Sequence, residues 1–174
     1  DLHFWGSWKN GVTGNINKFD IVIFEDIPAN PPGIPYSRPG RIVKRFPAPN
    51  YIARPITAPT MEGWYDPATN LVIPNDHQTY FQYNIFLTPQ QLFHQDSGRI
   101  YWLGVSADVV QGPVATEWGW KSTKNHWNDD AVWGTIPTGG TSCESPDNGT
   151  GTASQPSMCT YMPDNEVMII RDGL

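Results

Sequence analysis

Apolar and polar residues alternate with a period of two along most of the chain, and no stretch of about eleven residues carries a helical stripe. Successive side chains of a strand point to opposite faces, so this alternation predicts strands with one buried face. The clearest examples are residues 2–8, 18–26, 79–87 and 99–110. The last two carry the longest apolar faces and are predicted to be central strands.

Further segments predict shorter strands. Residues 40–46 place a cation on each face and predict an exposed or edge strand, continued by 51–57, where Pro55 weakens the end. Residues 63–74 predict two short strands around a turn in which Asp66 bonds the backbone. The remaining strands are predicted at 117–123, 130–134 and 166–172.

One helix of one or two turns is predicted, in the connector 88–98. Thr88 suits the N-cap position and Pro89 the first helical position. With about nine or ten strands and at most this one short helix, the chain is predicted to be all-β. We expect a single domain over residues 1–174, built as a two-layer antiparallel β-sandwich with jelly-roll-like topology.

Composition narrows the range of partners. With 11 Lys+Arg against 17 Asp+Glu, the net charge is -6, and the scattered cations form no basic run that would neutralise phosphates. We therefore expect no nucleic-acid partner. The chain has no apolar run of about 18 residues, so no transmembrane segment is predicted. It begins without Met, almost inside an apolar strand, which predicts a processed or excised piece of a longer precursor.

Cys143 and Cys159 lie in a polar loop, residues 139–163, that is rich in Gly, Ser, Thr and Pro. A disulfide between them would close about 15 residues and stabilise the fold by roughly 3 kcal/mol. The alternatives are two unrelated free thiols or, less favoured, a metal-binding pair. The disulfide is the preferred interpretation and predicts an oxidising compartment, hence a secreted, extracellular or periplasmic location.

The motifs of familiar enzymes are missing from the sequence. The four histidines lie far apart without an HxH or HExxH spacing, and no GxSxG-type elbow surrounds a serine. Glycoside hydrolysis needs two carboxylates across one bond, but the adjacent Asp129 and Asp130 would point to opposite faces of a strand. The sequence therefore predicts a protein that is not an enzyme.

Asp129 and Asp130 have two other interpretations. An Asx turn would use one carboxylate to accept backbone amides before the strand that follows. A calcium site would combine Asp129, Asp130 and nearby carbonyl oxygens, because Ca²⁺ takes six to eight oxygen ligands. Structural Ca²⁺ is thus the one cofactor that the sequence suggests.

The tryptophans provide a second candidate surface. Trp118 and Trp120 are spaced by two and should share a sheet face, with Glu117, Gly119 and Lys121 on the other. An aromatic face beside carboxylates and amides suits sugar recognition, so Trp118, Trp120, Trp127 and Asp129 are predicted to contact a ligand. The alternative is that these tryptophans belong to the core.

The chain also resembles a known family in the order of its motifs, which are "LHFWGSW", "DIPANPP", "YSRPG", "EGWYDP", "IYWLGVSA" and "WGWKSTKNHWNDDAVWG". It is similar to an uncharacterised domain of large extracellular proteins of environmental bacteria, which often carry export signals and sorting-tag or dockerin-like modules. The resemblance covers nearly the whole chain and implies a secreted β-sandwich module. The chain departs from the family pattern in the Cys-bearing insertion, 139–163. It also lacks the segment that normally precedes the first strand, which predicts an edge strand whose partner is missing or supplied by another chain.

We therefore expect a secreted, non-catalytic module that binds glycan or a cell-surface component through a Trp-rich face. The alternative is a structural or assembly subunit of an extracellular or periplasmic complex or filament, joined through exposed strand edges. A glycan-active enzyme is the third possibility.

Overall fold

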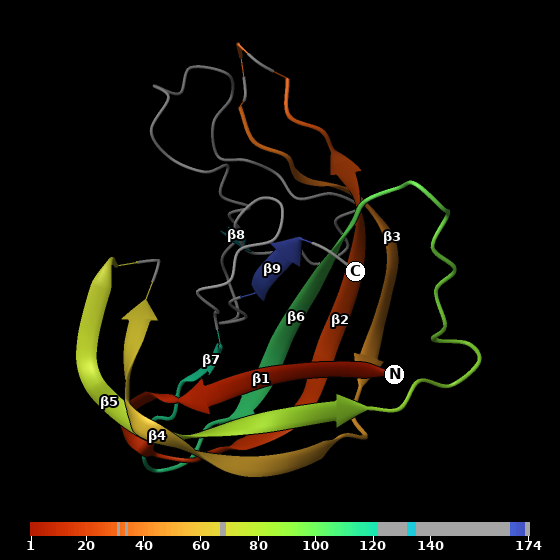
Figure 1. The fold of residues 1–174 in the computed structure, drawn as a ribbon. Helices are drawn as coiled ribbons and strands as arrows, with labels where there is room; N and C mark the ends of the chain where they lie inside the picture. Colours follow the sequence, from red (N-terminus) through yellow and green to blue (C-terminus); the bar gives the residue numbers. More distant parts are fainter. Residues whose placement is uncertain (31, 34, 67–68, 122–131, 135–167, 173–174) are drawn as a thin grey trace. The chain divides into compact units, whose positions relative to one another are not determined.

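The computed structural model describes residues 1–30, 32–33, 35–66, 69–121, 132–134 and 168–172 (Figure 1). These residues form two sheets and one 3-10 turn, η1 (Lys9–Gly11). One sheet has the strand order β4-β5-β1-β7, formed by β4 (Ile52–Asp66), β5 (Leu71–Ile85), β1 (Leu2–Trp8) and β7 (Trp118–Trp120). The other has the order β3-β2-β6-β9-β8, formed by β3 (Arg38–Ala48), β2 (Asn15–Ile27), β6 (Tyr101–Val110), β9 (Met168–Asp172) and β8 (Val132–Gly134).

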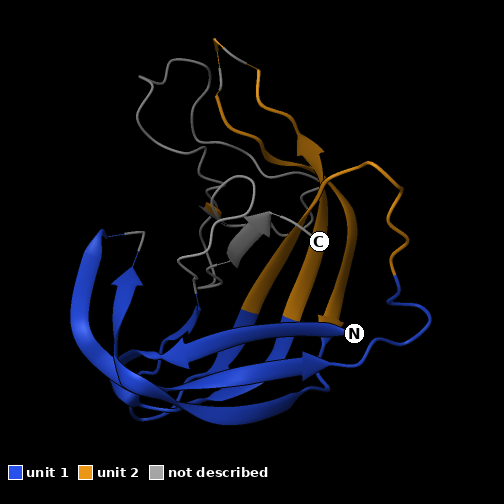
Figure 2. Ribbon diagram, viewed as in Figure 1, with its two compact units in different colours: residues 1–19, 48–92, 107–123 blue, residues 20–47, 93–106, 124–174 orange. Residues whose placement is uncertain are grey.

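The chain divides into two compact units (Figure 2). Unit 1 comprises residues 1–19, 48–92 and 107–123, and it holds the whole four-stranded sheet. Unit 2 comprises residues 20–47, 93–106 and 124–174. The prediction of an all-β chain with antiparallel pairing is confirmed by the registers of both sheets.

The core of unit 1 is a cluster of aromatic rings. Phe4 of β1 meets Phe19 edge-on at 5.0 Å between ring centroids and stacks on Tyr83 of β5 at 5.6 Å. Distances of this size are typical of favourable aromatic pairs. Further rings of the cluster are Tyr51, Phe81, Trp118 and Trp120. Alternation along β1 produces this core, because Phe4 and Trp8 are buried on one face whereas His3 and Trp5 on the other face are exposed.

The β4–β5 hairpin is longer than the sequence predicts. The segments predicted as separate short strands join into two strands of 15 residues each, which bend strongly in Figure 1. Pro55 and Pro59 are accommodated because β4 is an edge strand, where a missing N–H removes no ladder bond from a second neighbour. The register shifts between Thr57 and Glu62 and again before Trp64, as expected where bulges bend a strand.

The core of unit 2 forms around β2 and β6. Val22, Phe24, Trp102 and Val132 form a buried cluster, against which Ile42 packs. The indole Nε1 of Trp102 donates to Asp26 Oδ1 at 2.8 Å, so this fully buried ring leaves no polar atom unpaired. The predicted central positions of 79–87 and 99–110 are confirmed, since β5 and β6 each have two neighbours, and β3 is at an edge as predicted.

Two predictions are wrong. Residues 89–91 form a turn rather than a helix, although Thr88 does cap it: the Thr88 N–H donates to Gln91 Oε1 at 2.9 Å, and its carbonyl accepts from the Gln91 amide. One turn without an apolar stripe cannot offset the cost of nucleation. The first strand is not at an edge, because β1 pairs with both β5 and β7.

Candidate functional site

The two faces of the four-stranded sheet differ in chemistry. The face that carries Phe4 and Tyr83 belongs to the aromatic core of unit 1. Trp118 and Trp120 share this face, as their spacing predicts, and both rings pack against Phe4, at 6.3 and 5.5 Å between centroids. Both residues are half-buried. Their predicted contact with a ligand remains untested, but their position is that of core aromatics.

The opposite face carries a row of four residues, three from β4, β5 and β1 and one that directly follows β7. Gln82 of β5 is the register partner of both Arg54 in β4 and Trp5 in β1. The backbone N–H of Lys121, just after β7, donates to the Trp5 carbonyl at 2.8 Å. We call Arg54, Gln82, Trp5 and Lys121 the cross-strand row. Three strand spacings separate its ends, which is about 14 Å along the sheet.

Trp5 is the aromatic centre of the cross-strand row. Its side chain points to the other face of the sheet from that of Phe4, the preceding residue in β1. Trp5 is 42% exposed, whereas Phe4 is 2% exposed. In the next row on the same face, Tyr80 is the register partner of Ser7. The exposed indole of Trp5 provides a flat apolar surface. The Gln82 amide and the two cations of the row lie in line with it and can donate hydrogen bonds.

Lys121 is held in place by two side chains. Its Nζ donates to Glu62 Oε2 and lies 5.3 Å from the centroid of the Tyr80 ring. Burial lowers the pKa of Lys121 below its ordinary value. The ion pair and the ring fix this cation at one end of the cross-strand row.

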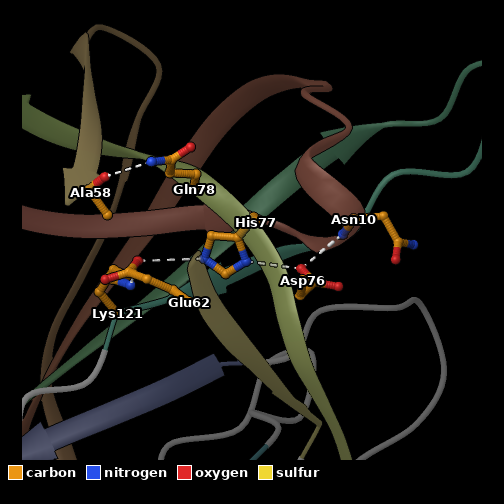
Figure 3. A network of polar contacts seen from close by, with 7 residues as sticks. All are labelled: Asn10, Ala58, Glu62, Asp76, His77, Gln78 and Lys121. Atoms are coloured by element: carbon orange, nitrogen blue, oxygen red, sulfur yellow. Dashed lines mark hydrogen bonds and ion pairs between the residues drawn. The ribbon is translucent and has the colours of Figure 1, made fainter. Parts of the chain in front are cut away.

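A polar network continues from Glu62 toward η1 (Figure 3). His77 Nε2 lies 3.7 Å from Glu62 Oε2, and His77 Nδ1 lies 2.8 Å from Asp76 Oδ2. Asp76 Oδ2 also accepts the backbone N–H of Asn10 at 2.9 Å. The network therefore ties together β4, β5, η1 and the residue that follows β7.

Several polar atoms of this region are buried without a hydrogen-bond partner among the described residues. They are Asp76 Oδ1, His77 Nε2 and Trp64 Nε1. The Trp64 ring covers Gly119, where an added Cβ would come within 2.9 Å of it, and lies 6.5 Å from the His77 ring. Because the Asp76 side chain is 0% exposed and that of His77 1%, neither can reach a substrate from these positions. Their role is to hold the hairpin.

The other residues predicted to form a site lie outside the described residues. These are Trp127, Asp129, Asp130, Cys143 and Cys159. Their predicted roles in ligand binding, calcium binding and the disulfide thus remain predictions. Within the described part of the chain, no group of three His, Cys, Asp or Glu side chains could hold a metal ion.

Sequence analysis missed the cross-strand row, although part of its signal was available. The alternation in residues 2–8 already placed Trp5 opposite Phe4. What the sequence did not supply was the pairing of β1 with β5 and β7, which brings Gln82 and Lys121 beside Trp5. Non-local strand pairing is not encoded in a local pattern.

The described residues include no helix with the length and apolar character to span a bilayer.

Comparison with known proteins places the chain in a family without assigning an activity. No curated protein and no solved structure matches the chain. A family described as "Domain of unknown function (DUF7901)" matches residues 1–162, and the chain belongs to this family.

Proposed function

We propose that the chain is a secreted, non-catalytic module that binds glycan through the cross-strand row. The observation that carries the proposal is the exposed indole of Trp5 on a sheet face, with Gln82 directly across the strand pair. An indole face can cover the C–H surface of a pyranose ring, while an amide and cations hydrogen-bond its hydroxyl groups.

The row also has the rigidity that a recognition surface needs. Arg54, Gln82 and Trp5 lie on paired strands, and Lys121, just after β7, is fixed by Glu62 and the Tyr80 ring. A side chain ordered before binding loses less conformational entropy when the ligand arrives. The proposal shifts the centre of binding from Trp118 and Trp120, which pack on Phe4, to Trp5.

The predicted sandwich and the compartment belong to the same proposal. Phe4 comes from one sheet and Phe19 from the other, and their contact inside unit 1 favours a two-layer sandwich of jelly-roll type. A secreted location is favoured by the predicted pairing of Cys143 with Cys159.

An assembly subunit is the less favoured alternative. That function was predicted to use an unpaired first strand, but β1 has two neighbours. The exposed edge of β4 carries Pro55 and Pro59, which cannot donate to a strand from another chain.

Affinity electrophoresis through gels containing soluble polysaccharides tests the glycan-binding proposal. We expect at least one polysaccharide to retard the protein, and Trp5→Ala to weaken that binding at least about tenfold, as for loss of a central aromatic contact. Phe86→Ala is the matched control, because Phe86 is 58% exposed but lies just beyond the end of β5. Retardation by no polysaccharide, or equal loss in both variants, would refute the proposal.

A further inference from the structure

We infer that the ligand of the cross-strand row is an anionic polysaccharide, whose carboxylate or sulfate groups bind Arg54. This inference rests on the proposed glycan-binding function and specifies the class of glycan. It follows from the charges of Arg54, Lys121 and Glu62 along the row.

The two cations of the row differ in how they are compensated. Lys121 is paired with Glu62, so its charge is largely neutralised inside the protein. Arg54 is exposed and forms no ion pair with another described residue, although Arg41, Arg45 and Arg99 all do. In a chain of net charge -6, Arg54 is thus an exposed cation with no carboxylate partner in the described part of the chain.

The position of Arg54 suits an anionic group on a ligand that already covers Trp5. Arg54 and Trp5 lie on either side of Gln82 in register, so about two strand spacings, roughly 10 Å, separate their backbones. A sugar ring stacked on the indole would therefore place a neighbouring residue of the polymer near the guanidinium. A guanidinium donates two parallel hydrogen bonds to a carboxylate or sulfate, which neutral hydroxyl groups cannot match.

Hydrogen bonds next to Arg54 hold the strands of this face in a fixed arrangement. In the next row on this face, His3 Nδ1 lies 2.7 Å from Asn84 Oδ1, and Asn84 Nδ2 donates to the Ile52 carbonyl. Ile52 and Asn84 are register partners, as are Arg54 and Gln82. The strand that carries Arg54 is thus tied to β5 by both main-chain and side-chain hydrogen bonds next to the proposed contact.

The test compares polymers that differ in charge. Three pairs serve as probes: methyl-esterified pectin and polygalacturonate, hydroxyethyl and carboxymethyl cellulose, and dextran and dextran sulfate. We expect the anionic member of at least one pair to bind about tenfold more tightly than its neutral partner, as for one added charge-assisted contact. This preference should shrink as NaCl is raised from low to high concentration, because the charges are exposed.

Two variants separate the contact from general charge effects. Arg54→Gln should abolish most of the preference, because it weakens binding to the anionic polymer much more than binding to the neutral one. Arg99→Gln removes the same charge from an exposed site in unit 2 and should keep the preference. Equal affinity for both members of every pair, or a preference that survives Arg54→Gln, would overturn the inference. The glycan-binding proposal would still stand in that case if Trp5→Ala weakened binding. Binding of no polymer would overturn both.

Discussion

Replacing Asp76 with alanine should destabilise the fold more than any exposed ion-pair deletion in unit 1. Its side chain is fully buried, and Oδ2 accepts from the Asn10 amide at 2.9 Å and faces His77 Nδ1 at 2.8 Å. A hydrogen bond to a charged group contributes about 1.5–3 kcal/mol. Because the His77 ring would remain buried without this carboxylate, we expect the free energy of unfolding to fall by about 3–5 kcal/mol, the range for breaking a buried pair.

Two further variants isolate the cause of that loss. Asp76→Asn keeps an acceptor oxygen but removes the charge, so it should lose about half as much, because neutral hydrogen bonds are roughly half as strong. Glu117→Ala is the matched exposed control: Glu117 accepts from Lys9 Nζ at 2.7 Å, but its side chain is 54% exposed. Exposed pairs contribute about 0–1 kcal/mol, so this variant should unfold almost like the parent.

The measurement is guanidinium-induced unfolding followed by tryptophan fluorescence and by far-UV circular dichroism. The two transitions should coincide if unfolding is two-state, and linear extrapolation then yields the free energy of each variant. The reasoning would be refuted if Asp76→Ala lost no more stability than Glu117→Ala. Equal losses for Asp76→Asn and Asp76→Ala would show that the acceptor geometry contributes nothing.

Three shorter predictions concern packing, pH and the disulfide. Gly6→Ala should cost about 1–3 kcal/mol in the same unfolding assay, because its Cβ would lie 2.4 Å from an indole carbon, whereas Gly112→Ala should be nearly neutral. Burial raises the pKa of Tyr83 to about 12. The phenol of an unfolded chain titrates at about pH 10, so the raised pKa of Tyr83 leaves the free energy of unfolding unaffected below that pH. Between about pH 10 and 12 the unfolded phenol ionises while the folded one does not, and the free energy of unfolding should fall. Tyr83→Phe should make this fall less steep. Thiol labelling under non-reducing denaturation should find Cys143 and Cys159 unreactive, and two labelled thiols would refute their pairing.

Local patterns predicted most of the strands, because burial of one sheet face imposes a period of two. Residues 99–110 were predicted as a central strand, and β6 lies between two neighbours. The hairpin of β4 and β5 was predicted as separate pieces, because Pro55 argues against strand structure when read alone. Only the position of β4 at an edge makes this proline acceptable, and that position is a property of the whole sheet.

The candidate site was harder to predict than the fold for a related reason. Spacing placed Trp118 and Trp120 on one face correctly, but it could not say whether that face meets the core. Which face is covered depends on the strands paired with β7 and on the rings opposite, such as Phe19. Those contacts join residues about one hundred positions apart, so no local window contains them.

Two glycines allow two tryptophans of the four-stranded sheet to pack closely against it. Gly6 lies on the core face and leaves space for the Trp118 ring, which an added Cβ would meet at 2.4 Å. Gly119 points to the opposite face and leaves space for Trp64, which is 9% exposed as a result of such packing. Trp5, by contrast, is 42% exposed. A side chain in place of either glycine would displace a ring, so the absence of a Cβ at Gly6 and Gly119 is what lets the indoles of Trp118 and Trp64 pack against the strands of this sheet.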